Sequence, residues 1–215
     1  LNPGFGGFDP DRFPVPQVDP PVQPAGYAFS IWGLIYLWLL AHGGYGLFRR
    51  ADAADWDRGR WPLLVSLAVG AAWLPVALLS PVWAMVLIWV MLVAALVALF
   101  RAPERDVWLA RAPLGVYAGW LPAAAWVSVA RVGAGCGGAF GEVAWAWIAL
   151  VAALVMAAAV LSQLRWGWSY AAAVVWALVA MAVANFAGDT ALAVAALGGA
   201  GAVAGYAVVV RRNPR

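Results

Sequence analysis

The chain has 215 residues, of which 66% are hydrophobic and 11% are charged, with a mean hydropathy of +0.84 and a net charge of +3. Because soluble globular proteins carry about 25% charged residues, this composition excludes that class and indicates an integral membrane protein. All 13 basic residues are arginines that lie singly or in pairs between apolar segments, which argues against nucleic acid as a partner. The single cysteine, Cys136, excludes an internal disulfide and a multi-cysteine metal site.

The first 26 residues are rich in proline, holding seven of the 14 prolines of the chain. No regular secondary structure fits such a segment, because proline removes backbone donors and restricts φ. Two alternatives stay open: an extended, partly polyproline segment lying over one end of a helix bundle, or a disordered tail.

The first apolar segment, residues 27–48, contains 22 residues without a formal charge. At 1.5 Å of rise per residue, this length covers about the 30 Å of a bilayer's hydrocarbon core, so it predicts a membrane-spanning helix. Phe29, Trp32 and Tyr36 fall at positions i, i+3 and i+7 and therefore share one helix face. This face is either an aromatic packing seam or one wall of a pocket for a flat apolar ligand.

Six further apolar segments follow, several of them bounded by proline or by charged loops. Their long unbroken apolar runs favour helices over barrel strands, which would alternate in polarity over about ten residues. The sequence therefore predicts an all-α, polytopic transmembrane helix bundle of seven spans. The six further spans are expected at residues 62–79, 82–100, 113–130, 143–164, 168–186 and 190–210.

The arginines are distributed unequally between the two ends of the predicted spans. By the positive-inside rule, the arginine-rich end is cytoplasmic, which places Leu1 outside and the C-terminus inside. Transfer of the proline-rich start to the outside would require a cleaved signal peptide or an additional helix before Leu1. Only Arg12 and Arg131 fall at the outer end, against eleven at the other: Arg49, Arg50, Arg58, Arg60, Arg101, Arg105, Arg111, Arg165, Arg211, Arg212 and Arg215.

Four short motifs, in this order, resemble those of the TspO/MBR family, the tryptophan-rich sensory proteins related to the translocator protein. They are DRFPV at 11–15, PAGYAFSIWGLIY at 24–36, Trp73-Leu74-Pro75, and Tyr117-Ala118-Gly119-Trp120. The resemblance is to the longer bacterial members, in which a hydrophobic helix precedes the DRFP segment, so an eighth, N-terminal helix is expected before Leu1. It implies a location in the bacterial inner membrane. It also implies a division into an extracytoplasmic segment (1–26), a four-span core (27–131) and a three-helix extension (132–215).

The resemblance further implies a sensory or regulatory protein that binds a flat hydrophobic ligand, a tetrapyrrole or an isoprenoid, without catalysis. No cofactor is predicted with certainty; a tetrapyrrole, a carotenoid or a lipid is the bound group expected. Two positions where the family commonly has asparagine are Gly70 and Ser128 here. The predicted ligand-binding residues are Phe29, Trp32, Tyr36, Trp73, Pro75, Tyr117, Trp120 and Ser128.

The sequence is also compatible with a second function, that of a non-catalytic accessory subunit in a larger membrane complex such as a pigment-protein assembly. The loss of the asparagines favours it, and two small-residue motifs, Gly115-x-x-x-Gly119 and Gly201-x-x-x-Gly205, could serve either packing within the bundle or docking to a partner or a second copy. The only histidine, His42, fits packing or an interfacial hydrogen bond, or an axial ligand to a tetrapyrrole metal. No charged residue falls in the middle of a predicted span, which argues against a proton relay.

Overall fold

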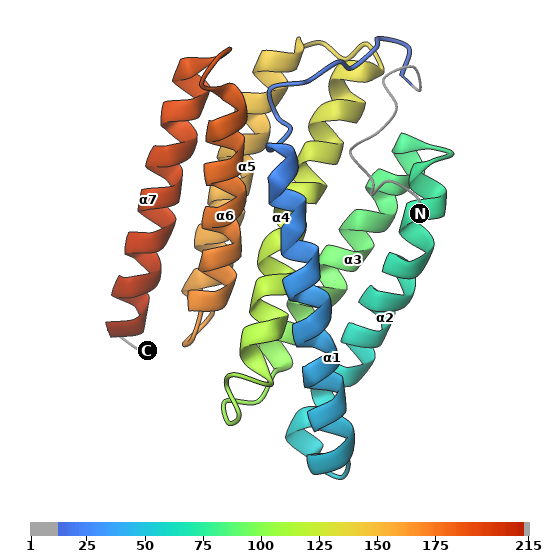
Figure 1. Ribbon diagram of the computed structural model, residues 1–215, viewed down its shortest axis with the longest axis vertical. Helices are drawn as coiled ribbons and strands as arrows, with labels where there is room; N and C mark the ends of the chain where they lie inside the picture. Colours follow the sequence, from blue (N-terminus) through green and yellow to red (C-terminus); the bar gives the residue numbers. More distant parts are fainter. Residues whose placement is uncertain (1–12, 213–215) are drawn as a thin grey trace.

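The structure, a computed structural model, describes residues 13–212 as a bundle of seven α-helices preceded by a short 3₁₀ helix (Figure 1). The helices run alternately up and down, with α2 and α7 at opposite edges and α4 in the middle of the view. The all-α fold class is confirmed. The elements are η2 (Gly26–Ser30), α1 (Ile31–Arg49), α2 (Ala54–Ala77), α3 (Pro81–Arg101), α4 (Arg111–Gly135), α5 (Glu142–Ser162), α6 (Trp168–Asn185) and α7 (Thr190–Arg212).

Six of the described helices are long and apolar enough to cross a membrane, all except α4. Helix α4 is less apolar because it carries an arginine near each end and several glycines and prolines. It is also the most enclosed helix, since every residue from Arg111 to Pro122 is buried and α1, α3, α5 and α6 pack around it. A helix surrounded by other helices does not face lipid, so its surface can carry the small residues that allow close helix packing. The chain is therefore a polytopic helical membrane protein.

The bundle places the ends of α1, α3, α5 and α7 and the starts of α2, α4 and α6 together, at the lower end in Figure 1. We call this the arginine-rich end. The buried Arg131 lies in the last turns of α4, at the opposite end. Arg12 and Arg215 lie outside the described residues. The residues that define the arginine-rich end are Arg49, Arg50, Arg58, Arg60, Arg101, Arg105, Arg111, Arg165, Arg211 and Arg212.

Residues 13–25 form an extended segment that crosses the upper end of the bundle (Figure 1). Backbone bonds attach it at Val15, whose N–H donates to Gly135 O at 2.9 Å, and at Ala25, whose N–H donates to Ala180 O at 3.1 Å. Asn185 of α6 donates from Nδ2 to Pro21 O at 2.8 Å. For these residues, the extended alternative holds; residues 1–12 lie outside the described part of the chain.

Helix α2 shows that the predicted start of the second span, Pro62, was wrong. The helix begins at Ala54, two turns earlier, with Asp55 and Asp57 in its first turn, where carboxylates interact favourably with the helix dipole. Pro62 is accommodated inside the helix at the loss of one backbone hydrogen bond. Helix α4 likewise runs from Arg111 to Gly135, beyond both ends of the predicted 113–130.

Helix α1 packs chiefly against α4, and hydrogen bonds attach it along its length, among them Trp38 Nε1 to Trp108 O at 2.8 Å. Near its start, Trp176 Nε1 donates to Ala28 O at 3.0 Å. Just beyond its end, Arg50 binds Asp106 of the α3–α4 loop, with Nε 2.7 Å from Oδ2. Between these attachments, Leu37 and Leu40 are exposed, so one side of α1 faces outward.

Candidate functional site

Four of the predicted ligand-binding residues surround one narrow cavity near the upper end of the bundle. Phe29 of η2 and Trp120 of α4 meet edge to face, with ring centroids 6.0 Å apart. Trp73 of α2 and Ser128 of α4 complete this part of the wall. The cavity has a volume of about 60 Å³, whereas ligand pockets typically measure about 300–1,000 Å³. It therefore accommodates a small group but not a whole tetrapyrrole.

Local hydrogen bonds orient two of these side chains. Trp73 Nε1 donates to Ala84 O of α3 at 2.9 Å, which fixes the indole against the neighbouring helix. Ser128 Oγ donates to Ala124 O, one turn earlier in α4, at 2.8 Å. The single proton of the Ser128 hydroxyl is thus engaged within the helix, and the hydroxyl keeps only acceptor capacity toward the cavity.

The upper end of the cavity is polar. Arg131 lines it together with Gln23 and Pro24 from the extended segment. The guanidinium donates from Nη1 to Gln23 Oε1 at 2.5 Å and from Nη2 to Gln17 O at 3.4 Å. Gln17 is held in turn by its bond from Nε2 to Glu142 Oε1 at 3.0 Å. The extended segment therefore forms part of the cavity wall, and Arg131 holds it there.

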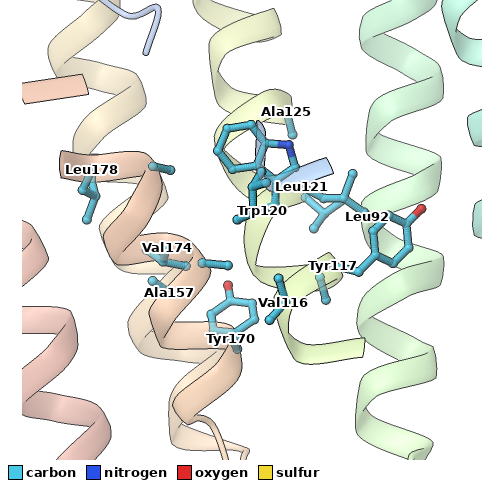
Figure 2. Packing of buried hydrophobic residues seen from close by; sticks show 14 of the residues in the cluster. Leu92, Val116, Tyr117, Trp120, Leu121, Ala125, Ala157, Tyr170, Val174 and Leu178 are labelled. Carbon is cyan, nitrogen blue, oxygen red and sulfur yellow. The ribbon is translucent and has the colours of Figure 1, made fainter. Parts of the chain in front are cut away.

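Trp32 and Tyr117 lie beside the cavity, one turn further down the bundle. Their ring centroids are 6.3 Å apart. Tyr36 also stacks on Trp32, with ring centroids 5.4 Å apart and an interplanar angle of 25°. The Tyr117 hydroxyl lies 2.7 Å from Ser66 Oγ of α2. Figure 2 shows Tyr117 directed toward α3 beside Leu92, with Trp120 above it on α4. A second aromatic group thus connects α1 with α4.

Two predicted residues lie away from this arrangement. Tyr36 is 57% exposed and faces the outside of the bundle, touching the other aromatic residues only through Trp32. Pro75 is exposed and is not part of the cavity wall. Phe29 lies in η2, which runs directly into α1, and both Phe29 and Trp32 contact α4, at Trp120 and Tyr117, whereas Tyr36 contacts Trp32.

Six residues of the cavity wall are not among the ligand-binding residues predicted from the sequence. Arg131 follows Ser128 by three residues and so lies on the same side of α4. It was one of only two arginines expected at the outer end, and this isolation was the signal that could have identified it. The small residues Ala123 and Ala124 and the extended segment carry no comparable signal. The residues missed are Gln23, Pro24, Ala123, Ala124, Val127 and Arg131.

His42 lies in a different place, at the lower part of α1. Its Nδ1 donates to Leu109 O at 2.7 Å, and its ring stacks on Trp56 with centroids 5.0 Å apart. These contacts match the packing and hydrogen-bond alternative. His42 also borders a groove of about 550 Å³ between α1 and α2. Within residues 13–212, no group of three or more His, Cys, Asp or Glu side chains could hold a metal ion.

An ion pair with two hydrogen bonds joins Arg50, just beyond α1, to Asp106. Besides the Nε bond, Arg50 Nη2 donates to Asp106 Oδ1 at 3.1 Å, so the guanidinium binds the carboxylate with two nitrogens. These hydrogen bonds lower the pKa of Asp106 below its ordinary value of 3.8 and raise that of Arg50. The pair thereby connects the end of α1 to the α3–α4 loop at the arginine-rich end.

The comparisons with known proteins give one match. The model of the family described as TSPO-like protein matches residues 16–209, which include the cavity wall and all seven described helices but for the last residues of α7. No curated protein and no solved structure matches the chain.

Proposed function

The chain belongs to the TSPO-like protein family, and on that premise we propose that it binds a flat hydrophobic ligand, a tetrapyrrole or an isoprenoid, at the aromatic residues between α1, α2 and α4. The contact of Phe29 with Trp120 beside Trp73 carries this proposal, because it places three aromatic rings from three elements around one cavity. The TSPO-like family is generally non-catalytic. Its role here would be sensory or regulatory, through binding and not through turnover.

The small volume of the cavity means that the ligand must displace a side chain or a helix to bind. Helix α1 is the element expected to move, because it packs chiefly against a single helix, α4, and its other side faces outward. A ligand entering between α1 and α2 would meet Trp32 and Tyr36 first and then Phe29 and Trp120. The exposed Tyr36 would thereby become a contact residue only when ligand is bound.

The proposal includes the orientation of the protein. Ten arginines at one end favour that end as cytoplasmic, and in this orientation the cavity would lie in the outer half of a bacterial inner membrane, with residues 13–25 above it. We retain the division into an outer segment (1–26), a core (27–131) and an extension (132–215) as part of the proposal. Its basis is that the aromatic residues of the cavity wall, in η2, α2 and α4, all fall within residues 27–131.

A titration of metal-free protoporphyrin into the purified protein tests the proposal. Phe29→Ala removes a ring of the cavity wall that is only partly buried, so the variant is expected to fold. Loss of one ring contact and its buried area should weaken binding about tenfold, since a tenfold change in the dissociation constant corresponds to about 1.4 kcal/mol of binding free energy. Trp83→Ala, which removes a 64% exposed indole at the same end of the bundle, is the matched control and should bind like the parent.

Tryptophan fluorescence quenching measures the affinities, and gel filtration establishes that both variants are folded. Equal affinity of Phe29→Ala and Trp83→Ala, or no binding by the parent, would contradict the proposal.

One observation favours the second candidate, an accessory subunit of a larger membrane complex. On α7, an added Cβ at Gly201 or Gly205 would meet no atom of the described residues within 4 Å, so this glycine motif faces away from the described part of the chain. Close approach of another helix is the usual role of such a motif. Purification in mild detergent distinguishes the two candidates, because stoichiometric co-purification of other subunits supports the second and a monomer or dimer that binds the ligand supports the first.

A further inference from the structure

The arginine-rich end contains a buried arginine, Arg111, which is the first residue of α4. It is 7% exposed, and neither its Nε nor its Nη1 has a hydrogen-bond acceptor among the described residues. Burial of guanidinium nitrogens without acceptors is costly, because each N–H loses its bond to water. Arg111 therefore has hydrogen-bonding capacity that the described part of its own chain does not use.

Two charged groups act on Arg111 with opposite sign. The Glu104 carboxylate attracts its charge from 4.0 Å, which is beyond hydrogen-bond distance, and the Arg165 guanidinium repels it. The same carboxylate also lies 3.3 Å from Arg165 Nη1. Because guanidinium–carboxylate bonds are normally about 2.7–2.9 Å long, Glu104 forms a strong bond with neither arginine.

This sharing of one carboxylate sets the group apart from the other ion pairs of the described residues. We call Arg111, Glu104 and Arg165 the shared-carboxylate cluster. It has two positive charges and one negative charge, so one positive charge is not balanced within it. The other ion pairs match one arginine with one carboxylate: Arg50 with Asp106, Arg60 with Asp57, and Arg105 with Asp55.

A row of three indoles accompanies the cluster. Trp108 precedes Arg111 by three residues, and Trp168 follows Arg165 by three. The rings of Trp108 and Trp168 have centroids 4.9 Å apart, and Trp38 of α1 stacks on Trp108 at 6.4 Å. Tryptophans at the ends of membrane-spanning helices lie at the level of the lipid headgroups. The row therefore indicates that the cluster lies at the depth of the bilayer phosphates.

The starts of two helices add to the positive potential. Helices α4 and α6 both begin at this end, the lower one in Figure 1, and neither has an acidic residue in its first turn. The N-terminal end of a helix carries partial positive charge and favours anions.

We propose that the shared-carboxylate cluster binds the phosphodiester of an anionic phospholipid such as phosphatidylglycerol, with the row of indoles beside its glycerol backbone. Two nonbridging oxygens of the phosphodiester can each accept from one guanidinium, while Glu104, on an exposed part of the α3–α4 connection, turns outward. A choline lipid brings its own cation to a cluster that is already positive and is disfavoured. Basic pockets between helices at the cytoplasmic side are a usual place for anionic headgroups. This site is separate from the aromatic cavity and does not depend on the function proposed for it.

The test measures how much lipid the full chain retains in detergent. The protein is separated by gel filtration from micelles that contain either dioleoylphosphatidylglycerol or dioleoylphosphatidylcholine, and the bound lipid is quantified by mass spectrometry. The parent should retain the glycerol lipid at least about fivefold more than the choline lipid. Equal retention of the two lipids overturns the inference.

Variants of the cluster locate the binding. Arg111→Gln and Arg165→Gln should each remove most of the preference, and Arg165→Gln decides if Arg111→Gln does not fold, since the Arg165 side chain is 57% exposed. Arg58→Gln removes the same charge from an exposed position at the same end and is the matched control, which should keep the preference. An equal loss in Arg58→Gln and Arg165→Gln would show that net charge alone retains the lipid, and it overturns the inference. Circular dichroism establishes that the variants are folded.

Glu104→Gln separates lipid binding from a purely structural role of the cluster. Because Glu104 competes with the phosphodiester for the same two arginines, its removal should increase the retention of phosphatidylglycerol. If Glu104 only holds the two arginines together, the variant will retain as much lipid as the parent or less, which contradicts the inference.

Inorganic phosphate distinguishes the lipid from a free anion of the same chemistry. Sodium phosphate and sodium chloride at equal ionic strength should release bound phosphatidylglycerol to the same extent. Stronger release by phosphate would assign the cluster to a free phosphate and overturn the lipid as its ligand.

Discussion

The hydroxyl of Tyr117 lies 2.7 Å from Ser66 Oγ, and both groups are buried between α4 and α2. Ser66 Oγ donates its own proton to Met91 O of α3 at 2.8 Å, so Tyr117 is the donor in the first bond. One chain of two hydrogen bonds therefore connects three helices below the aromatic cavity. Since bulk water does not reach this position, a lost partner there cannot be replaced easily.

Removing the Tyr117 hydroxyl tests the contribution of this chain to stability. Tyr117→Phe should lower the free energy of unfolding by about 1 kcal/mol, the usual net value of one hydrogen bond. Tyr36→Phe is the control, because Tyr36 is exposed and has no hydrogen bond to the rest of the described chain. Thermal unfolding in detergent, followed by circular dichroism, measures both; equal midpoints for the two variants would show that the bond contributes nothing.

The two glycine motifs should respond differently to an added methyl group. At Gly119, a Cβ would lie 2.4 Å from Tyr170 O of α6, so Gly119→Ala must push α4 and α6 apart and should cost about 1–3 kcal/mol. At Gly201, no atom lies within 4 Å, and Gly201→Ala should be neutral or slightly stabilising.

Thermal midpoints of these two alanine variants provide the comparison. A large loss for Gly201→Ala in the purified protein would instead indicate that α7 contacts a second copy there.

The ion pair of Arg50 with Asp106 gives a dependence on pH. Its hydrogen bonds lower the pKa of Asp106 below 3.8, so the pair contributes stability above that pH and loses it as the pH falls through the lower, folded-state value. Because Arg50 and Asp106 are partly exposed, the contribution is small and decreases with salt.

Hydrogen exchange of residues 45–50 measures the attachment of α1 at this loop. Exchange should accelerate in the parent as the pH falls below 3.8, after correction for the intrinsic pH dependence, and should already be fast in Asp106→Asn at pH 7. A parent and variant that exchange alike at pH 7 would contradict a role of the pair in holding α1.

Cys136 reports the orientation of the bundle. It is free and exposed, at the end of α4 opposite the arginine-rich end. If the arginine-rich end is cytoplasmic, a membrane-impermeant thiol reagent should label Cys136 in intact cells. The control combines Cys136→Ala with Ala51→Cys, an exposed position between α1 and α2, which should be labelled only after the membrane is opened. The reverse pattern would invert the proposed topology.

The site was only partly predictable from the sequence. Trp73, Trp120 and Ser128 were identified through family motifs, and they do line one cavity with Phe29. Tyr36 was included because it follows Trp32 by four residues, yet that spacing only places both on one side of α1. Whether this side faces α4 or lipid depends on the rotation of the helix in the bundle. Arg131 was missed because its partners Gln17 and Gln23 are more than 100 residues away in the chain.

The amino-acid sequence by itself determined the class of protein, the number of helices and their alternation. Apolar runs long enough to span a bilayer must form helices there, and the arginines accumulate in the loops on one side of it. Each helix and each loop can therefore be predicted from its own residues, without knowledge of how the helices pack. Only the tertiary structure decided that α4 is central, that Gly119 faces Tyr170 while Gly201 faces outward, and that residues 13–25 close the upper end over Arg131. These features depend on which helices pack together and at what rotation. In a membrane, that choice rests on close fit between side chains far apart in sequence, because the lipid favours no helix pair over another.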